Sequence, residues 1–143
     1  MMIPEEMKAA LVKMNDDAWH KRDLAAAYEI YSEEVIFHRL PFPPVVGKEA
    51  NMQADAGTLT AFSGVRSTIE EIIVDGDTAA IRWTWAANHT GASPSLGIPP
   101  TGKRVSFAGT SVYHFRGNKI VEQWEYGDLL GFLQQLGVVP PLG

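Results

Sequence analysis

The side chains that could do chemistry in this chain are carboxylates and histidines. The 143-residue sequence has no cysteine, which excludes thiol nucleophiles, disulfides and cysteine-bound metals. Its four histidines, at positions 20, 38, 89 and 114, do not have the spacing of metal ligands. No glycine-rich phosphate loop follows a predicted strand, and no G-x-S-x-G nucleophile motif is present. We therefore expect acid–base chemistry that needs no cofactor and no metal.

Asp128 is the carboxylate with the sharpest functional interpretation. If it faces an apolar cavity, its charged form is disfavoured, and it could then take a proton from the carbon next to a carbonyl group and return it later. The alternative is structural, because Asp128 precedes Leu129 and Leu130 and could cap the last helix. A cap stabilises the charged form, which is the wrong direction for a base.

The position of His114 relative to Asp128 depends on the register of the last two strands. A two-residue turn at Gly117-Asn118 pairs His114 with Val121. Strand alternation then places a set of side chains on the face opposite His114: Tyr113, Phe115, Glu122, Trp124, Tyr126 and Asp128. A bulge at Gly127 would reverse Asp128 and bring it to the side of His114.

Several aromatic side chains are candidates for the walls of a binding pocket, because a ring offers a flat apolar face and, in Trp and Tyr, one polar group. Some come from the last two strands and others from helices that should cover the sheet, and ordinary core packing explains them equally well. His38, which lies just before a proline-rich segment, could stand at the rim. The substrate-binding candidates are Trp19, Tyr28, His38, Tyr113, Trp124 and Tyr126.

The elements that must position these residues change type along the chain. Helical spacing predicts helices over residues 4–18, 24–31 and 47–62, and a short last helix over 129–136. A period of two predicts strands over 35–38, 65–74, 78–90, 104–116 and 119–126. This order predicts a single α+β domain over residues 1–143. Its bent mixed or antiparallel sheet would curl into a cone-shaped barrel, with three N-terminal helices over the concave face and an apolar interior.

The charge balance limits the partners. Twelve Lys and Arg against 17 Asp and Glu give a net charge of −5, and no basic run could neutralise phosphates. The first residues are acidic rather than basic and apolar, and the longest apolar runs are far short of a membrane span. We therefore expect a soluble cytoplasmic protein without nucleic-acid or membrane partners.

Short motifs occur in a distinctive order along the second half of the chain: NHTG at 88–91, GIPPTGK at 97–103, GNKIVEQW at 117–124, an aspartate at 128 and QQLG at 134–137. Together they resemble the SnoaL-like polyketide cyclase and ester cyclase family of the nuclear transport factor 2-like superfamily, over roughly residues 35–140. The resemblance implies a cone-shaped fold, usually dimeric, and ring closure by an intramolecular aldol reaction without cofactor or metal. It also implies that Asp128, which matches the family's acid–base aspartate by position, is catalytic, with His114 assisting it.

Together these observations predict a cyclase or isomerase that acts on a small apolar or aromatic carbonyl compound. Two alternatives remain open: a small-molecule-binding module without turnover, in which Asp128 is only a cap, and a hydrolase that opens an epoxide or lactone in the same pocket. We also expect a homodimer through the outer face of the sheet, which would carry residues such as Val112 and Val121. Trp83 and Trp85 share one face of their strand, which could belong either to this interface or to the pocket.

Overall fold

The computed structural model describes residues 2–94 and 96–143, and it has the predicted α+β architecture. Its helices are α1 (Pro4–Trp19), α2 (Leu24–Ala27), a single 3-10 turn η1 (Tyr28–Ile30), α3 (Lys48–Ala61) and α4 (Leu129–Leu136). Its strands are β1 (Tyr31–Arg39), β2 (Val45–Val46), β3 (Phe62–Asp75), β4 (Thr78–His89), β5 (Arg104–Arg116) and β6 (Lys119–Gly127). The first strand is longer than predicted, and β2 was not predicted.

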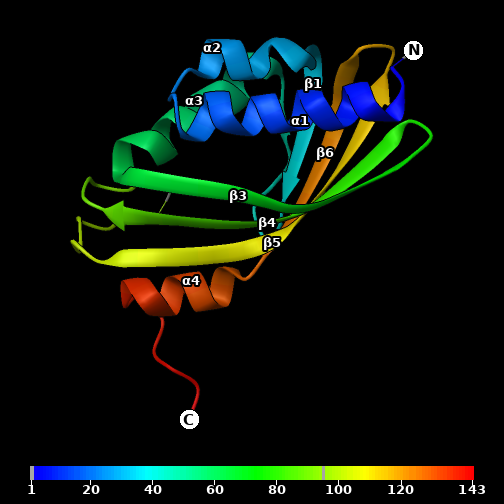
Figure 1. Cartoon of the computed structure of the whole chain (residues 1–143). Coiled ribbons are helices and arrows are strands. Elements are labelled where there is room, and N and C mark those ends of the chain that lie inside the picture. Colours follow the sequence, from blue (N-terminus) through cyan, green and yellow to red (C-terminus); the bar gives the residue numbers. More distant parts are fainter. Residues whose placement is uncertain (1, 95) are drawn as a thin grey trace.

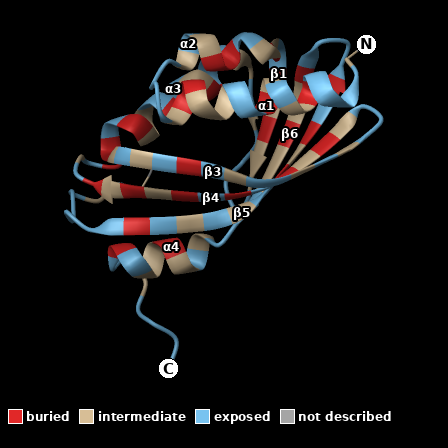
Figure 2. Cartoon of the chain, in the orientation of Figure 1, coloured by how far each residue is buried: buried red, intermediate tan, exposed pale blue. Residues whose placement is uncertain are grey.

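The strands form one mixed sheet in the order β2-β1-β6-β5-β4-β3. Strand β1 runs parallel to β6, and all other neighbours are antiparallel. Figure 1 shows that the sheet is strongly bent, with α1, α2 and α3 on its concave side and α4 packed beside β5. Buried residues, red in Figure 2, occur on the helices and on the strands that they cover, so the core lies between these helices and the concave face.

The helices begin and end where the sequence provides caps. In α1, Pro4 occupies the first turn, and the Glu6 side chain accepts a hydrogen bond from the Ile3 N–H at 3.0 Å. Asp23 caps α2 by accepting from the Ala26 N–H at 3.1 Å. Gly137 closes α4 in the left-handed conformation, with φ of 80°. These local signals fix the helix bounds close to those predicted.

A bulge in the β5–β6 hairpin corrects the predicted register. Arg116 pairs with Lys119 as expected, but the next pairs are Phe115 with Ile120 and His114 with Glu122, so that Val121 is an extra residue. A shift of one residue reverses every side chain that follows. The predicted pairing of His114 with Val121 is therefore wrong. There is no bulge at Gly127, which pairs directly with Gly109.

Of the two locations considered for Trp83 and Trp85, the structure shows the pocket side and not the outer face. Trp83 and Trp85 are each 8% exposed and face the concave side, whereas their neighbours Arg82 and Thr84 are exposed on the outer face. Of the apolar residues expected at a dimer interface, Val112 and Val121 remain half-buried candidates. The homodimer stays a prediction that rests on a smaller apolar surface than expected.

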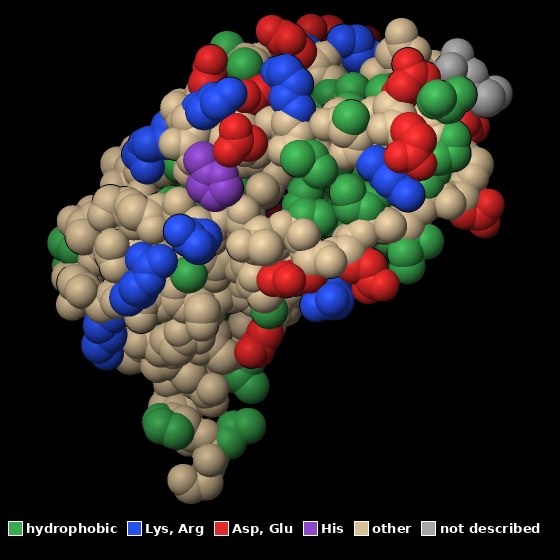
Figure 3. All heavy atoms as spheres, in the orientation of Figure 1, with side chains coloured by type: hydrophobic (Ala, Val, Ile, Leu, Met, Phe, Trp, Pro, Cys, Tyr) green, Lys and Arg blue, Asp and Glu red, His purple; other side chains and the backbone are tan. Residues whose placement is uncertain are grey.

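Some hydrophobic side chains are visible at the molecular surface. On the face in Figure 3, hydrophobic side chains are visible between α1 and β3, and charged side chains of both signs surround them.

Within residues 2–94 and 96–143, no helix is long and apolar enough to cross a membrane.

Two glycines provide a test of this packing. A methyl group at Gly127 would overlap the ring of Phe107, whereas one at Gly57, inside α3, would meet only Pro94 Cγ at 3.6 Å. We predict that Gly127→Ala lowers the free energy of unfolding by about 1–3 kcal/mol through overpacking. The control Gly57→Ala should raise it by about 0.5–1 kcal/mol, because alanine favours helix interiors. Urea unfolding measures both, and a fully stable Gly127→Ala protein would contradict the contact with Phe107.

Candidate active site

A cavity of about 590 Å³ lies between the helices and the concave face of the sheet. Its walls come from α1, α3, η1, all long strands and the start of α4. The aromatic part of the lining is Trp19, Tyr28, Tyr31, Phe37, Phe42, Phe62, Trp83, Trp85, Phe107, Tyr113 and Phe132. Cavities of this size and character bind molecules of several rings.

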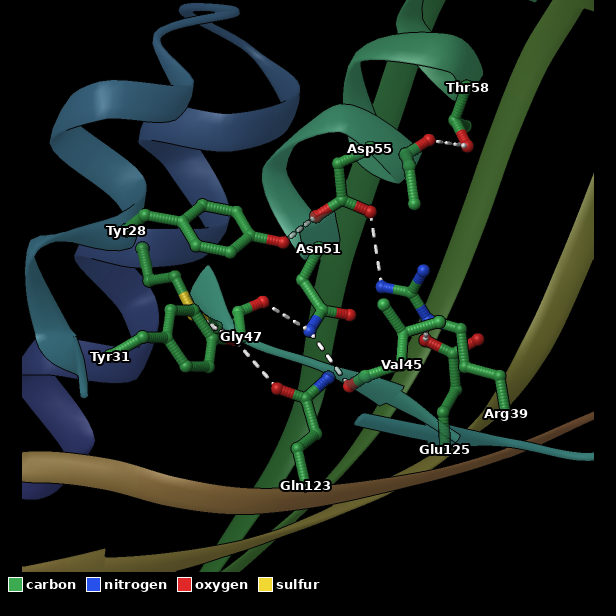
Figure 4. A network of polar contacts seen from close by, with 12 residues as sticks. Tyr28, Tyr31, Arg39, Val45, Gly47, Asn51, Asp55, Thr58, Gln123 and Glu125 are labelled. Carbon is green, nitrogen blue, oxygen red and sulfur yellow. Dashed lines mark hydrogen bonds and ion pairs between the residues drawn. The ribbon is translucent and has the colours of Figure 1, made fainter. Parts of the chain in front are cut away.

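Three charged side chains meet at one end of the cavity (Figure 4). Arg39 and Glu125 are the last register pair of the parallel strands β1 and β6, so the two side chains stand next to each other. Arg39 Nε lies 3.8 Å from Glu125 Oε1, and Arg39 Nη2 donates a hydrogen bond to Asp55 Oδ1 at 3.1 Å. The Tyr28 hydroxyl donates to Asp55 Oδ2 at 2.5 Å.

The start of α3 holds Asp55 in this position. Asn51 lies one turn before Asp55 and is fully buried. Its Nδ2 donates to the carbonyl oxygens of Val45 in β2 and Gly47, at 3.0 and 2.8 Å, which ties the helix to the sheet edge (Figure 4). Because residues four apart lie on one face of a helix, Asp55 then points in the same direction, towards Arg39.

Burial dominates the electrostatics of this end of the cavity. Desolvation raises the pKa of Glu125; Arg39 opposes the shift without cancelling it, and Asp55 adds to it. Burial alone would lower the pKa of Arg39, but Asp55 and Glu125 outweigh it, and the pKa is raised. Desolvation, then Asp55, raises the pKa of Tyr28, which keeps the phenol as a donor. Glu125 thus holds its proton to a higher pH than an exposed glutamate does.

Glu125 and Arg39 also keep unused hydrogen-bonding capacity. In the part of the chain that the structure describes, the Glu125 carboxylate accepts no hydrogen bond, and Arg39 Nη1 donates none. Arg39 Nε is buried without a hydrogen-bond partner. A carbonyl compound in the cavity could therefore meet a cationic donor and a carboxylate within a few ångströms of each other.

Other polar groups of the lining are mostly paired. The Tyr31 hydroxyl donates to Gln123 Oε1 at 2.7 Å, and Trp83 Nε1 donates to Ser111 Oγ at 3.0 Å. Burial raises the pKa of Tyr113, so this residue is a neutral phenol in the cavity wall. The charged side chains of the lining are thus gathered around Arg39, and most of the remaining wall is apolar.

The predicted site residues fall into two groups. Trp19, Tyr28 and Tyr113 line the cavity. His38, His114 and Trp124 also come together, but on the outer face of the sheet, because the bulge at Val121 turns Trp124 outwards. There His38 Nε2 lies 2.7 Å from Glu122 Oε2. The His38 ring stacks on Trp124 with centroids 5.1 Å apart, and the His114 ring meets Trp124 edge-on at 4.6 Å. Tyr126 is 50% exposed on the same face.

Asp128 lies outside the cavity. It is exposed and caps α4, its Oδ1 accepting a hydrogen bond from the Gly131 N–H at 2.9 Å. It is six residues beyond Glu122, the partner of His114, which corresponds to a separation of roughly 20 Å along the strand. Of the two interpretations of Asp128, the structure shows the helix cap, and it does not place Asp128 in the cavity or beside His114. The cause is the phase of β6, which turns Glu125 inwards instead. The catalytic roles of Asp128 and His114 stay predictions.

Sequence reasoning missed Glu125, Arg39 and Asp55. Each carried a weak signal in the sequence. Arg39 and Glu125 are charged residues near the ends of β1 and β6, and Asp55 is a carboxylate on the buried face of α3. Within the described residues, no group of three or more His, Cys, Asp and Glu side chains could hold a metal ion.

Comparisons with known proteins agree with the fold. Residues 9–136 match the family described as SnoaL-like polyketide cyclase. Among solved structures, AclR from Streptomyces galilaeus, provisionally assigned as a hydroxylase, is 27% identical with a TM-score of 0.84, over 99% of this chain and 87% of that one. A protein from Acidithiobacillus ferrooxidans, provisionally assigned as a polyketide cyclase, is 26% identical with a TM-score of 0.79, over 96% and 98% of the chains.

A third structure, from Jannaschia sp. CCS1 and provisionally assigned as a SnoaL-like polyketide cyclase, has a TM-score of 0.86 over 99% of both chains at 18% identity. The family resemblance of the sequence motifs is thereby confirmed, and so is the nuclear transport factor 2-like arrangement of helices and sheet. The chain belongs to the SnoaL-like polyketide cyclase family.

Proposed function

We propose that this chain is an acid–base enzyme that moves a proton at the carbon next to a carbonyl group of a small, neutral, apolar or aromatic molecule. Closure of a ring by an intramolecular aldol reaction and isomerisation both begin with this step. The observation that supports the proposal is the pair of Glu125, whose pKa is raised, and Arg39, at one end of an aromatic cavity.

Arg39 and Glu125 would have different roles in this step. Arg39 Nη1 donates a hydrogen bond to the substrate carbonyl oxygen, and the Glu125 carboxylate removes a proton from the adjacent carbon. The electron pair of the broken C–H bond moves into the carbonyl, and the guanidinium stabilises the resulting enolate oxygen. The enolate carbon then attacks a second carbonyl group or takes a proton back, and Glu125 returns its proton to the product.

Asp55 and Tyr28 act as positioning residues in this scheme. The hydrogen bond from Arg39 Nη2 to Asp55 fixes the plane of the guanidinium and leaves Nη1 for the substrate. The hydrogen bond from Tyr28 satisfies the second oxygen of Asp55, so that this carboxylate does not compete with Glu125 for a substrate proton.

Charge and shape narrow the substrate class. The end of the cavity holds one guanidinium and two carboxylates, which gives an anionic ligand no net attraction. Long aromatic walls favour a flat ring system by stacking. The family description as polyketide cyclases, and the provisional assignment of the A. ferrooxidans relative, support the same class of carbonyl-bearing molecule.

Exchange of solvent deuterium into 1-tetralone, an apolar bicyclic ketone, tests the proposed step and can be followed by NMR against a protein-free background. We predict that Glu125→Gln lowers the catalysed rate by roughly 10²–10⁴, because an amide cannot accept the proton. Asp128→Asn is the matched control: it makes the same chemical change three residues away, preserves the cap, and should exchange at nearly the wild-type rate.

The outcomes separate the candidate functions. Loss of exchange in Asp128→Asn with full exchange in Glu125→Gln would make Asp128 the base. A wild-type protein that binds 1-tetralone and related cyclic ketones without any exchange would be a binding module.

The pH dependence gives a second prediction. Catalysed exchange should rise with pH and reach its midpoint above 4.5, the ordinary pKa of a glutamate, because only the carboxylate accepts a proton and burial raises the pKa of Glu125.

The contribution of Glu125 to the stability of the fold should fall as pH rises, whereas the exchange rate rises. The folded protein holds the Glu125 proton more tightly than the unfolded chain, so this group stabilises the fold at low pH, and the contribution is lost as pH rises through the raised pKa. The thermal midpoint of Glu125→Gln, measured against wild type, should therefore improve between pH 4 and pH 8. A difference that is constant over this range would contradict a raised pKa.

A further inference from the structure

The wall of the cavity is thin next to Glu125. Pairing between β1 and β6 ends at Arg39 and Glu125, after which β1 leaves the sheet at Leu40 while β6 continues beside β5 to Gly127. Beyond Glu125, therefore, β6 has no strand neighbour on the side of β1. The sheet has a gap at the position of the proposed base.

A depression of about 370 Å³ lies over this gap. Its lining residues are Leu40, Ala108, Gly109, Glu125, Tyr126, Gly127 and Asp128. Three of them, Leu40, Glu125 and Gly127, also line the main cavity, so the two spaces share a wall. The outer residues Ala108, Tyr126 and Asp128 are exposed, and the depression is therefore in contact with solvent.

Two glycines keep this wall thin. Gly109 and Gly127 face each other across β5 and β6, and neither brings a side chain to fill the gap. A Cβ at Gly109 would overlap the backbone of Tyr126, and one at Gly127 would overlap the ring of Phe107. The close approach of the strands requires glycine here, and the side of β6 towards Leu40 is left without cover.

The main mouth of the cavity is elsewhere. The exposed residues of the cavity lining that lie away from the depression are Phe42, Pro43, Gln53, Ala54 and Pro94, which places the mouth between the segment after β1, α3 and the loop after β4. A ligand that enters there and reaches Arg39 would fill the space between Glu125 and the mouth. Water could then reach Glu125 only from the other side.

We propose that the depression beside Asp128 is a second, narrow opening through which the Glu125 carboxyl group exchanges its proton with solvent while a ligand fills the main mouth. Solvent water reaches the opening from outside, past the exposed cap residue Asp128. The proton taken from the substrate passes from Glu125 to this water, and a solvent proton replaces it, so that charge and atoms balance. The opening is argued from the wall that the two spaces share, whereas its role in proton exchange rests on the proposed function.

The opening can be tested without knowing the reaction. Because the chain has no cysteine, Glu125→Cys introduces the only thiol, and its labelling by the small reagent aminoethyl methanethiosulfonate can be followed by mass spectrometry. Ala54→Trp narrows the main mouth, and Ala108→Phe fills the depression from outside, with Ala108→Met as the replacement if the larger side chain prevents folding. Thr58→Cys is the matched control, because Thr58 lines the cavity but not the depression.

We expect Ala54→Trp to slow labelling of Thr58→Cys by at least about tenfold. The same substitution should change the labelling rate of Glu125→Cys by no more than about twofold. Adding Ala108→Phe to the Glu125→Cys, Ala54→Trp protein should then slow labelling by at least about tenfold. If Ala54→Trp alone protects both thiols, or if filling the depression changes nothing, the second opening does not exist.

The role in proton exchange has its own readout. With the depression filled, the proton on Glu125 returns to the carbon from which it came, so Ala108→Phe should slow deuterium entry into 1-tetralone by at least about tenfold without weakening its binding. If Ala108→Phe exchanges deuterium into 1-tetralone at the wild-type rate, the depression has no role in proton exchange. If the wild-type protein exchanges no deuterium, the proposed function fails, while the thiol labelling still decides whether the opening exists.

Discussion

The parallel pairing of β1 with β6 is the constraint on which the rest of the site depends. It is the one parallel contact in the described sheet, and its last pair places Arg39 beside Glu125. A guanidinium held between two carboxylates tolerates a partly buried position that it could not occupy alone. The helices then close over it: Asp55 from α3 and Tyr28 from η1 complete the hydrogen bonds that the strands leave open.

The same cluster carries an electrostatic cost. Two carboxylates share one guanidinium, and Asp55 takes the better hydrogen bonds, so Glu125 is left underpaired in a low-dielectric site. A glutamine in its place would relieve that cost, which is the pattern expected where activity requires a strained group. The remaining lining is aromatic and its polar atoms are mostly paired, so the cost is concentrated at one end of the cavity.

Local signals in the sequence were sufficient for most of the fold. Asp23, Pro4 and Gly137 fixed helix ends, and the turns at Gly76 and Gly117 fixed both hairpins. Two non-local features could not be read in this way. The parallel contact between β1 and β6 joins residues more than eighty positions apart, and the bulge at Val121 depends on how β6 fits both its neighbours. Every misplaced site residue traces to one of these two features.

The bulge also shows why a matching motif position does not by itself identify a catalytic group. Asp128 matches the family's aspartate by position, yet a single extra residue at Val121 determines which carboxylate of β6 faces the cavity. With this register, Glu125 lines the cavity and the depression, whereas Asp128 lines only the depression. The two carboxylates therefore stand on opposite sides of one thin wall. The register of β6, and not the position of a motif, therefore decides which of these carboxylates a ligand in the cavity can meet.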